Sequence, residues 1–563
     1  MVVSTTSFSF KKLKSLADWK LLLFLVLFLN VKMAVKIPAI VLIYLLQFNF
    51  KFGFSLKNSR LPLFYLLAIA IAVLNWVISR NYLNINYNIV LLTGIGFWVL
   101  CILAMHQVKL FVENNDTETI HRTIVIFFII NAVLSLCNLA LIIFETGAIN
   151  PYTYQGQYQK YFIGTGDYIR GITFDTSTTN AVLNAWGVIY FLTKKNAIML
   201  LVCMAVMLST ASNFTNMVLL GVLALIFVFK SSRDQKSLIV ACMVFLVVFM
   251  VKISPQNNTY VAENLKRTFH LGAANQQMPV RPKLGMPITL MPDSLLTTDQ
   301  KKWKVAQRYT DSVYVANHTQ VANRQAKKTL QPLRRPAETV LKTESGRIFI
   351  PKPDINTMPY QHVIDTTPYQ RQLLAFIDSR KASLPLSGQD NFKLSLPGKA
   401  IGWLQTFHFL QQHPSKIFTG DGMGNFSSKL AFRASGLGFA GGYPQKFIYL
   451  DPDFLSNHLD VYLNFFSKKT DVHSLANNPN SVYDQLLAEY GILGLTAFLI
   501  YYLGFFLRRY KQLTYGLPIL LVVLSMFFIE YWFEQLSILI FFEMLLLLNI
   551  KETSSKTIVK YAY

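Results

Sequence analysis

The sequence predicts an all-α polytopic membrane protein with about twelve transmembrane helices. Three observations support this fold class. The chain of 563 residues is 53% hydrophobic and only 15% charged, whereas soluble globular domains carry about 25% charged residues. Apolar stretches close to the length of a bilayer span recur along the chain. One long polar segment, residues 254–480, interrupts this series.

The positions of the apolar stretches predict the individual spans. The first stretch follows a lysine-rich N-terminus and resembles a signal peptide. No small-residue cleavage site follows it, so we expect an uncleaved helix. The expected spans are residues 19–33, 35–50, 62–79, 88–106, 123–146, 179–193, 196–210, 214–230, 237–253, 481–507, 514–530 and 535–550. The chain therefore divides into residues 1–253 with nine spans, the loop 254–480, and residues 481–563 with three spans.

The distribution of positive charge predicts the orientation of these spans. With the N-terminus inside the cell, the cytoplasmic segments hold 20 Lys and Arg residues and the short outer segments hold 5. Lys and Arg accumulate in short cytoplasmic connections, while long loops escape this rule. We therefore expect both termini in the cytoplasm. The long loop and a shorter segment, residues 147–178, are expected on the outer side.

Charge and cysteine content exclude several classes of function. The net charge of +24 suggests contact with anionic lipid head groups. No zinc-finger, RNP-like or helix-turn-helix pattern accompanies this charge, so we expect no nucleic-acid partner. The four cysteines lie in apolar stretches without a Cys-x-x-Cys pair, which excludes a thiolate zinc site. The sequence Asp451-Pro452-Asp453 has the letters of a metal-binding motif, but we interpret it as a turn.

The long loop changes character along its length. It holds 27 basic and 15 acidic residues, and its middle, residues 301–347, is the most basic part. This middle part is either a pair of solvated helices with flexible linkers or a surface for a phosphate-rich partner. Farther on, apolar residues at helical spacing predict an amphipathic helix that begins near Lys399 and ends near Pro414. A second helix is predicted over residues 427–433.

Between these two helices, three glycines stand at alternate positions. Glycine permits tight turns and a close approach of the backbone to a ligand, so the turn either contacts a substrate or is purely structural. The residues of this turn that would lie near a substrate are Gly420, Gly422, Gly424 and Asn425. In the shorter outer segment, Arg170 stands beside glycine. It can bind a phosphate through two parallel hydrogen bonds, or it can be an interfacial residue that reaches the head groups.

These segments together resemble the O-antigen ligase and O-antigen polymerase superfamily of bacterial envelope glycosyltransferases. The resemblance rests on three places: Arg170-Gly171-Ile172-Thr173-Phe174 before Asn180, Lys399-x-x-x-Trp403 with the glycine turn, and Pro479-Asn480-Ser481 through Leu495. The number of spans and the position of the long loop also match. The chain departs from the family at three places: Lys399, where the family usually has Arg; Ser209–Asn213, where the Arg that often follows a Ser is missing; and Pro479, where ligases have His. The missing histidine favours a polymerase over a ligase.

The resemblance implies an enzyme of the bacterial inner membrane. It would move a glycan from undecaprenyl diphosphate to an acceptor hydroxyl at the periplasmic face during surface polysaccharide assembly, without a metal or other cofactor. The expected partners are the lipid-linked glycan, an acceptor glycan or lipid A-core, membrane lipids and other assembly proteins. A transporter of lipid-linked glycans is the alternative from another class. The chain lacks the two similar halves that many transporters show.

The resemblance also suggests roles for individual residues. Departure of the lipid diphosphate develops negative charge, which cationic side chains can stabilise. Arg170 and Lys399 are the expected diphosphate ligands, with Arg433 as a third. The acceptor hydroxyl needs a general base, and the sequence leaves four candidates open: His473, His458, Asp175 and Glu489.

Overall fold

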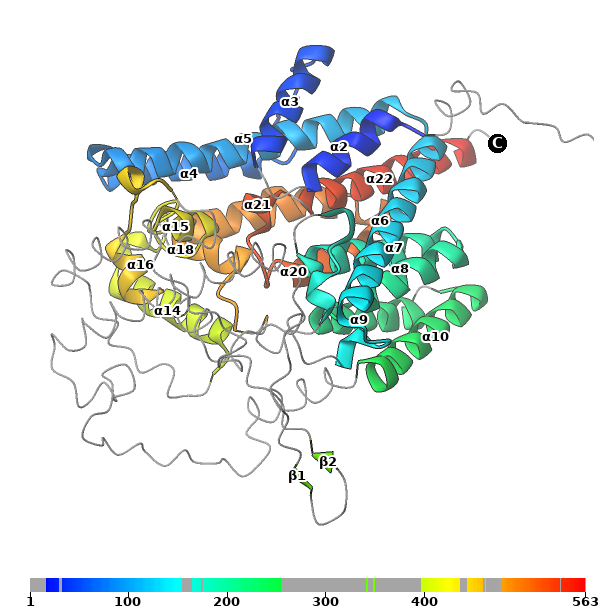
Figure 1. The fold of residues 1–563 in the computed structure, drawn as a ribbon. Helices are drawn as coiled ribbons and strands as arrows, with labels where there is room; N and C mark the ends of the chain where they lie inside the picture. The colour runs from blue at the N-terminus through cyan, green and yellow to red at the C-terminus, as the bar shows by residue number, and fades with distance from the viewer. Residues whose placement is uncertain are drawn as a thin grey trace, which may run out of the picture.

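The chain is described here from a computed structural model. The structure describes residues 17–29, 33–153, 165–173, 176–229, 231–254, 396–435, 443–458, 477–536 and 538–561, and also positions 341–342, 348–349, 461 and 475. These residues are almost entirely helical (Figure 1). A short antiparallel pair, β1 (Leu341–Lys342) and β2 (Ile348–Phe349), lies in the long loop.

The N-terminal part begins with five apolar helices. They are α2 (Trp19–Leu29), α3 (Met33–Gln47), α4 (Phe64–Ile78), α5 (Ile85–Asn114) and α6 (Thr117–Thr146). Side chains set the ends of the longest two. Asn84 accepts hydrogen bonds from the first amides of α5, and Asp116 does the same for α6. Gly147, in the left-handed conformation, ends α6.

The next four helices pack as a second group. They are α7 (Ser177–Thr193), α8 (Ala197–Ser209), α9 (Asn213–Phe229) and α10 (Arg233–Val248), the last extended by a π-helical turn over Phe249–Ile253. Helix α7 packs against α8, α9 and α10 and against α20 (Gly516–Met526). Nearly all side chains of α7 are buried as a result, and this helix forms the centre of the group.

The C-terminal part returns to the first group of helices. Helix α18 (Val482–Ala497) continues through a π-helical segment, Phe498–Leu503, into α19 (Gly504–Leu507). After α20 come α21 (Trp532–Gln535) and α22 (Leu539–Tyr561). Helix α18 packs against α4, and α22 packs against α5. The remaining one-turn helices are η1 (Asn81–Leu83), η2 (Pro151–Thr153), η3 (Thr165–Tyr168), η4 (Gly171–Thr173), η9 (Pro414–Lys416), η10 (Gln445–Phe447) and η13 (Tyr510–Gln512).

Length and surface composition identify a membrane-embedded protein. Four helical stretches are long and apolar enough to cross a bilayer: Ile85–Asn114, Thr117–Thr146, Arg233–Ile253 and Val482–Leu507. Helices α3, α9 and α10 carry exposed leucine, valine and phenylalanine side chains, as expected of surfaces that face lipid. Each of the twelve predicted segments contains a helix, but seven of these helices are only 11–17 residues long. Twelve complete spans therefore stay a prediction.

Candidate functional site

The described residues in the last third of the long loop, chiefly 396–435 and 443–458, lie at one end of the molecule (Figure 1). Their first helix, α14 (Gly398–Gln412), ends immediately before His413 and Pro414, which confirms the predicted helix and its end. The second predicted helix is also present as α15 (Lys429–Ala434), with the Ser428 hydroxyl as its N-cap. The glycine turn lies between these helices and packs against α18.

Helix α18 is broken where it meets this turn. Gly491 has φ 66° and ψ −165°, so the helical hydrogen bonds stop there. Backbone groups of the turn replace them. The carbonyls of Ala488 and Glu489 accept from the amides of Asp421 and Gly422, at 2.8 and 3.1 Å. The interrupted helix would leave these two carbonyls without partners, and the turn supplies them. Two amides of α18 beyond the break are paired with the same segment of the chain.

Those two amides lie on the far side of the break. Ile492 N donates to the Ile417 carbonyl at 2.9 Å, and Leu493 N donates to the Phe418 carbonyl at 3.1 Å. Buried backbone groups need such partners. The chain segment from Ile417 to Gly422 therefore completes the broken helix, and we call this arrangement the sealed break.

The glycines of the turn are required by conformation and by space. Gly420, Gly422 and Gly424 have φ of 74°, 104° and 79°. A Cβ atom on Gly420 would lie 2.3 Å from the carbonyl carbon of Glu489, and one on Gly424 would lie 2.5 Å from the Val90 side chain. These close neighbours belong to the protein itself, which favours the structural interpretation of the turn over direct contact with a substrate.

Glu489, one of the candidate bases, holds the same turn. Its two carboxylate oxygens accept from Gly424 N at 2.9 Å and from Phe426 N at 3.2 Å, and the residue is buried. Asn425 is buried beside it and donates from Nδ2 to the Asp421 carbonyl. Both oxygens of Glu489 therefore accept from backbone amides of the turn, and this placement does not favour the role of a general base.

The Lys399 side chain also makes contacts that hold the fold together. Its ammonium donates to the carbonyl oxygens of Asn478 and Asn480, at 2.9 and 2.5 Å, and so joins α14 to the end of the loop. Burial lowers the pKa of Lys399 to about 7, although Glu530 and Asp484 oppose this shift. An amine engaged in this way does not favour the diphosphate-binding role that the resemblance implies for Lys399.

Arg170, in contrast, is exposed on an ordered backbone. Asn138 Oδ1 on α6 accepts from the amides of Arg170 and Gly171, at 3.2 and 3.0 Å, and Asn131 Oδ1 accepts from Ile172 N at 3.0 Å. Gly171 has φ 58° and leaves no room for a Cβ atom beside Asn131. Three consecutive amides are thereby fixed by α6, while the guanidinium stays accessible.

The structure does not bring the predicted cationic residues together. The Arg170 segment packs against α6 and α7, whereas α14, which carries Lys399, packs against α18 and α16 (Pro452–Asn457). Figure 1 shows these two regions in different parts of the molecule. In the described part of the chain no hydrogen bond or ion pair joins Arg170 to Lys399. Arg433 lies on α15, the helix that directly follows the glycine turn, and not with Arg170.

The other candidate bases divide into one buried residue and two that lie outside the described residues. His458 is buried, its ring centroid lies 5.3 Å from that of Phe426 with the two rings tilted, and it lies close to Gly402. Burial lowers its pKa to about 3, so the imidazole is neutral. It is enclosed in the protein core and is not placed to meet an acceptor. Asp175 and His473 lie outside the described residues.

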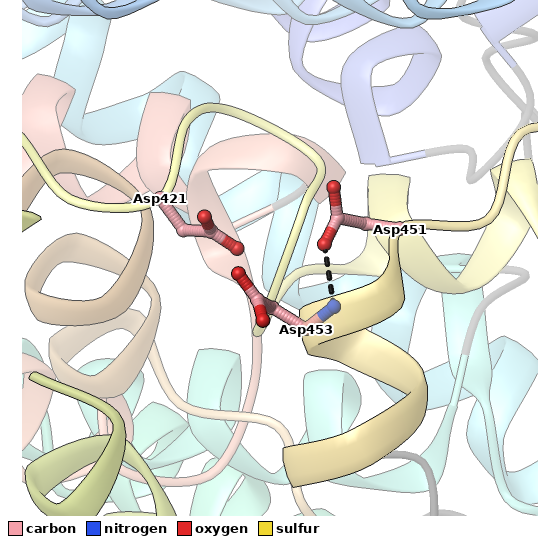
Figure 2. A group of neighbouring side chains, drawn as sticks. All are labelled: Asp421, Asp451 and Asp453. Atoms are coloured by element: carbon pink, nitrogen blue, oxygen red, sulfur yellow. Dashed lines mark hydrogen bonds between the residues drawn. The ribbon is translucent and has the colours of Figure 1, made fainter. Parts of the chain in front are cut away.

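Three aspartates that the sequence did not connect meet beside the turn (Figure 2). Asp421, Asp451 and Asp453 each place one carboxylate oxygen within 4.8 Å of the others. Lys416 Nζ bonds to Asp421 Oδ1 at 2.5 Å and to Asp453 Oδ2 at 2.7 Å. We call these three carboxylates the aspartate cluster. Burial and the neighbouring charge of Asp451 raise the pKa of Asp421, against the effect of Lys416.

The interpretation of Asp451-Pro452-Asp453 as a plain turn is corrected by the structure. Asp451 is the N-cap of α16, with Pro452 at the first helical position, and its Oδ1 accepts from Asp453 N at 2.7 Å. Asp followed by Pro is a common helix start. That signal was present in the sequence, but nothing local indicated that Asp421 would join the pair.

A second polar network was also missed. Asp484, buried at the start of α18, accepts from the hydroxyls of Thr406 and Ser427, at 2.8 and 2.9 Å. Ser427 also lies 3.1 Å from the Tyr531 hydroxyl. These contacts join α14, the glycine turn, α18 and the segment before α21. Because the partners are 57 to 104 residues apart in sequence, no local pattern could have predicted them.

Comparisons with protein-family models, with curated proteins and with solved structures found no match for this chain.

Proposed function

We propose that this protein is an integral membrane glycosyltransferase of the O-antigen polymerase or ligase type. In this proposal it moves a glycan from undecaprenyl diphosphate to an acceptor hydroxyl at the periplasmic face of the bacterial inner membrane. The observation that carries the proposal is the accessible guanidinium of Arg170 on a backbone fixed by Asn138 and Asn131. An accessible cationic side chain on a fixed backbone can offset the charge that develops on a departing diphosphate.

In this proposal the chain has twelve spans, both termini lie in the cytoplasm and the long loop lies in the periplasm. The glycan would leave the lipid diphosphate as the acceptor oxygen attacks. Arg170 would bind the diphosphate through paired N–H donors and offset the charge that develops on it. Glu489 and His458 have structural contacts. Asp175 and His473 therefore become the preferred candidates for the base that accepts the acceptor's proton.

The test uses a strain that lacks its native copy of this protein. We expect Arg170→Ala to abolish or strongly reduce surface glycan at an unchanged protein level, and Arg170→Lys to restore part of it. The control is Arg122→Ala, which removes an arginine whose side chain is 50% exposed and pairs with Glu118 within α6. Normal glycan length and amount with Arg170→Ala would contradict the role proposed for this residue.

The form of the residual glycan distinguishes the two enzyme classes. A polymerase variant should lose the ladder of repeat units on a gel and retain a single unit. A ligase variant should lose the glycan from lipid A-core altogether. Pro479, in place of the ligase histidine, favours the polymerase, because proline cannot act as a base.

One observation favours the transporter alternative. Many transporters place their substrate at interrupted helices, and α18 is interrupted at Gly491. In this protein, however, the free backbone groups on both sides of the break are bonded to the chain itself. Reconstitution into proteoliposomes would decide between the classes: flux of a lipid-linked glycan without elongation or transfer would contradict the enzyme proposal.

A further inference from the structure

The aspartate cluster has the ligands that a divalent cation of the hard type prefers. One oxygen from each of Asp421, Asp451 and Asp453 lies within 4.8 Å of the others. Figure 2 shows the carboxylates of Asp421 and Asp453 turned toward each other, with Asp451 beside them. Ca²⁺ binds carboxylate oxygens at about 2.3–2.6 Å, so oxygens on opposite sides of one ion stand at most about 5 Å apart. The spacing of the cluster fits this geometry.

The charge of the cluster is only partly balanced. Lys416 provides one ammonium for three carboxylates. Among the residues that the structure describes, no other basic side chain forms an ion pair with the cluster. Asp451 receives neutral donors instead: the Tyr449 hydroxyl at 3.0 Å and the Asp453 amide at 2.7 Å. With all three carboxylates ionised, two negative charges remain.

A second observation points to a ligand at this place. Asp421 is 3% exposed, and its Oδ2 atom has no hydrogen-bond partner. A buried carboxylate oxygen without a partner is costly. A cation beside Asp421 Oδ2 would satisfy it.

We propose that Asp421, Asp451 and Asp453 bind a divalent cation, Ca²⁺, through one oxygen each. The Lys416 ammonium, on a side chain that is 30% exposed, moves out as the ion enters. The ion then joins the glycine turn to the start of α16 and so strengthens the packing around the sealed break. Its role is structural, and it does not depend on the proposed glycosyl transfer.

The test measures binding directly. Purified full-length protein in detergent is treated with a chelator and dialysed against radioactive Ca²⁺. We expect one ion per chain with a dissociation constant of about 10⁻⁴–10⁻³ M, in the range of extracellular calcium modules. Asp453→Asn should weaken binding at least about tenfold. The control, Asp234→Asn, removes a 77% exposed aspartate paired with Lys195 and should bind like the wild type.

Lys416→Met separates a cation site from a plain ion-pair network. If the ammonium and the ion compete, this variant should bind Ca²⁺ at least about tenfold more tightly, because a unit positive charge has left the site. Its thermal unfolding midpoint should then rise on addition of Ca²⁺. Absence of binding in both wild type and Lys416→Met would overturn the proposal. Equal binding by wild type and Asp453→Asn would overturn it as well, since the ion would then sit elsewhere.

Discussion

Replacing Gly420 with alanine tests whether the glycine turn seals the break in α18. The added Cβ atom would lie 2.3 Å from the carbonyl carbon of Glu489 and 2.5 Å from its oxygen. Both atoms belong to the backbone and cannot rotate away. The turn would have to move off α18, and the four hydrogen bonds of the sealed break would be strained or lost.

The structure gives the size of this effect. A non-glycine residue at φ 74° costs about 1–2 kcal/mol in the left-handed region. Each hydrogen bond that is lost costs about 0.5–1.5 kcal/mol. Loss of two of the four bonds, together with the backbone cost, lowers the free energy of unfolding by about 2–5 kcal/mol.

The chain provides a matched control in Gly147. It also has a positive φ, 65°, but no atom lies within 4 Å of the position that its Cβ would take. Gly147→Ala therefore carries the backbone cost without the collision. Thermal unfolding midpoints in detergent, measured at one scan rate, should be clearly lower for Gly420→Ala than for Gly147→Ala. Equal midpoints would refute the argument that the turn is held against α18.

Two further predictions concern Lys399 and Asn138. Burial lowers the pKa of Lys399 from 10.5 to about 7, so between these values the unfolded chain binds more protons than the folded one. Folding stability should then rise with pH, by at most about 1.4 kcal/mol per unit. In Lys399→Met the rise of the unfolding midpoint with pH that is due to Lys399 should be absent. Equal pH dependence of the unfolding midpoint in the wild type and in Lys399→Met would contradict this prediction. Asn138→Ala removes the acceptor for two amides of the Arg170 segment. It should reduce surface glycan in the same direction as Arg170→Ala at normal protein levels, and an unchanged ladder would count against the positioning of Arg170 by α6.

The parts of the fold that could be predicted from the sequence depend on local signals. Apolar stretches located the helices, because burial and lipid contact select the same residue types along each one. The end of α14 at Pro414 and the position of α15 also followed from nearby residues. Helix lengths were harder to predict. Several apolar helices are shorter than a bilayer span.

The break in α18 could not be predicted in this way. Residues 486–495 form a mostly apolar run that is compatible with a continuous helix, and the two glycines within it, Gly491 and Gly494, are tolerated in a helix. The break depends on the backbone from Ile417 to Gly422, about 70 residues earlier in the chain, which supplies the missing hydrogen bonds. The contacts of Lys399 could not be predicted for the same reason, because its carbonyl partners belong to the distant residues Asn478 and Asn480. A positive charge in the sequence does not reveal whether it binds a ligand or a distant carbonyl.

The sealed break also changes where the chemistry should be sought. The glycine turn left two interpretations open, and its contacts with Glu489 and the α18 backbone favour the structural one. A carboxylate whose two oxygens already accept from buried amides is not free to bind an acceptor hydroxyl. Arg170 has the opposite properties, with a fixed backbone and an accessible side chain. A general base must lie within hydrogen-bond reach of the acceptor, so Asp175, five residues after Arg170, is the first position at which to look for it.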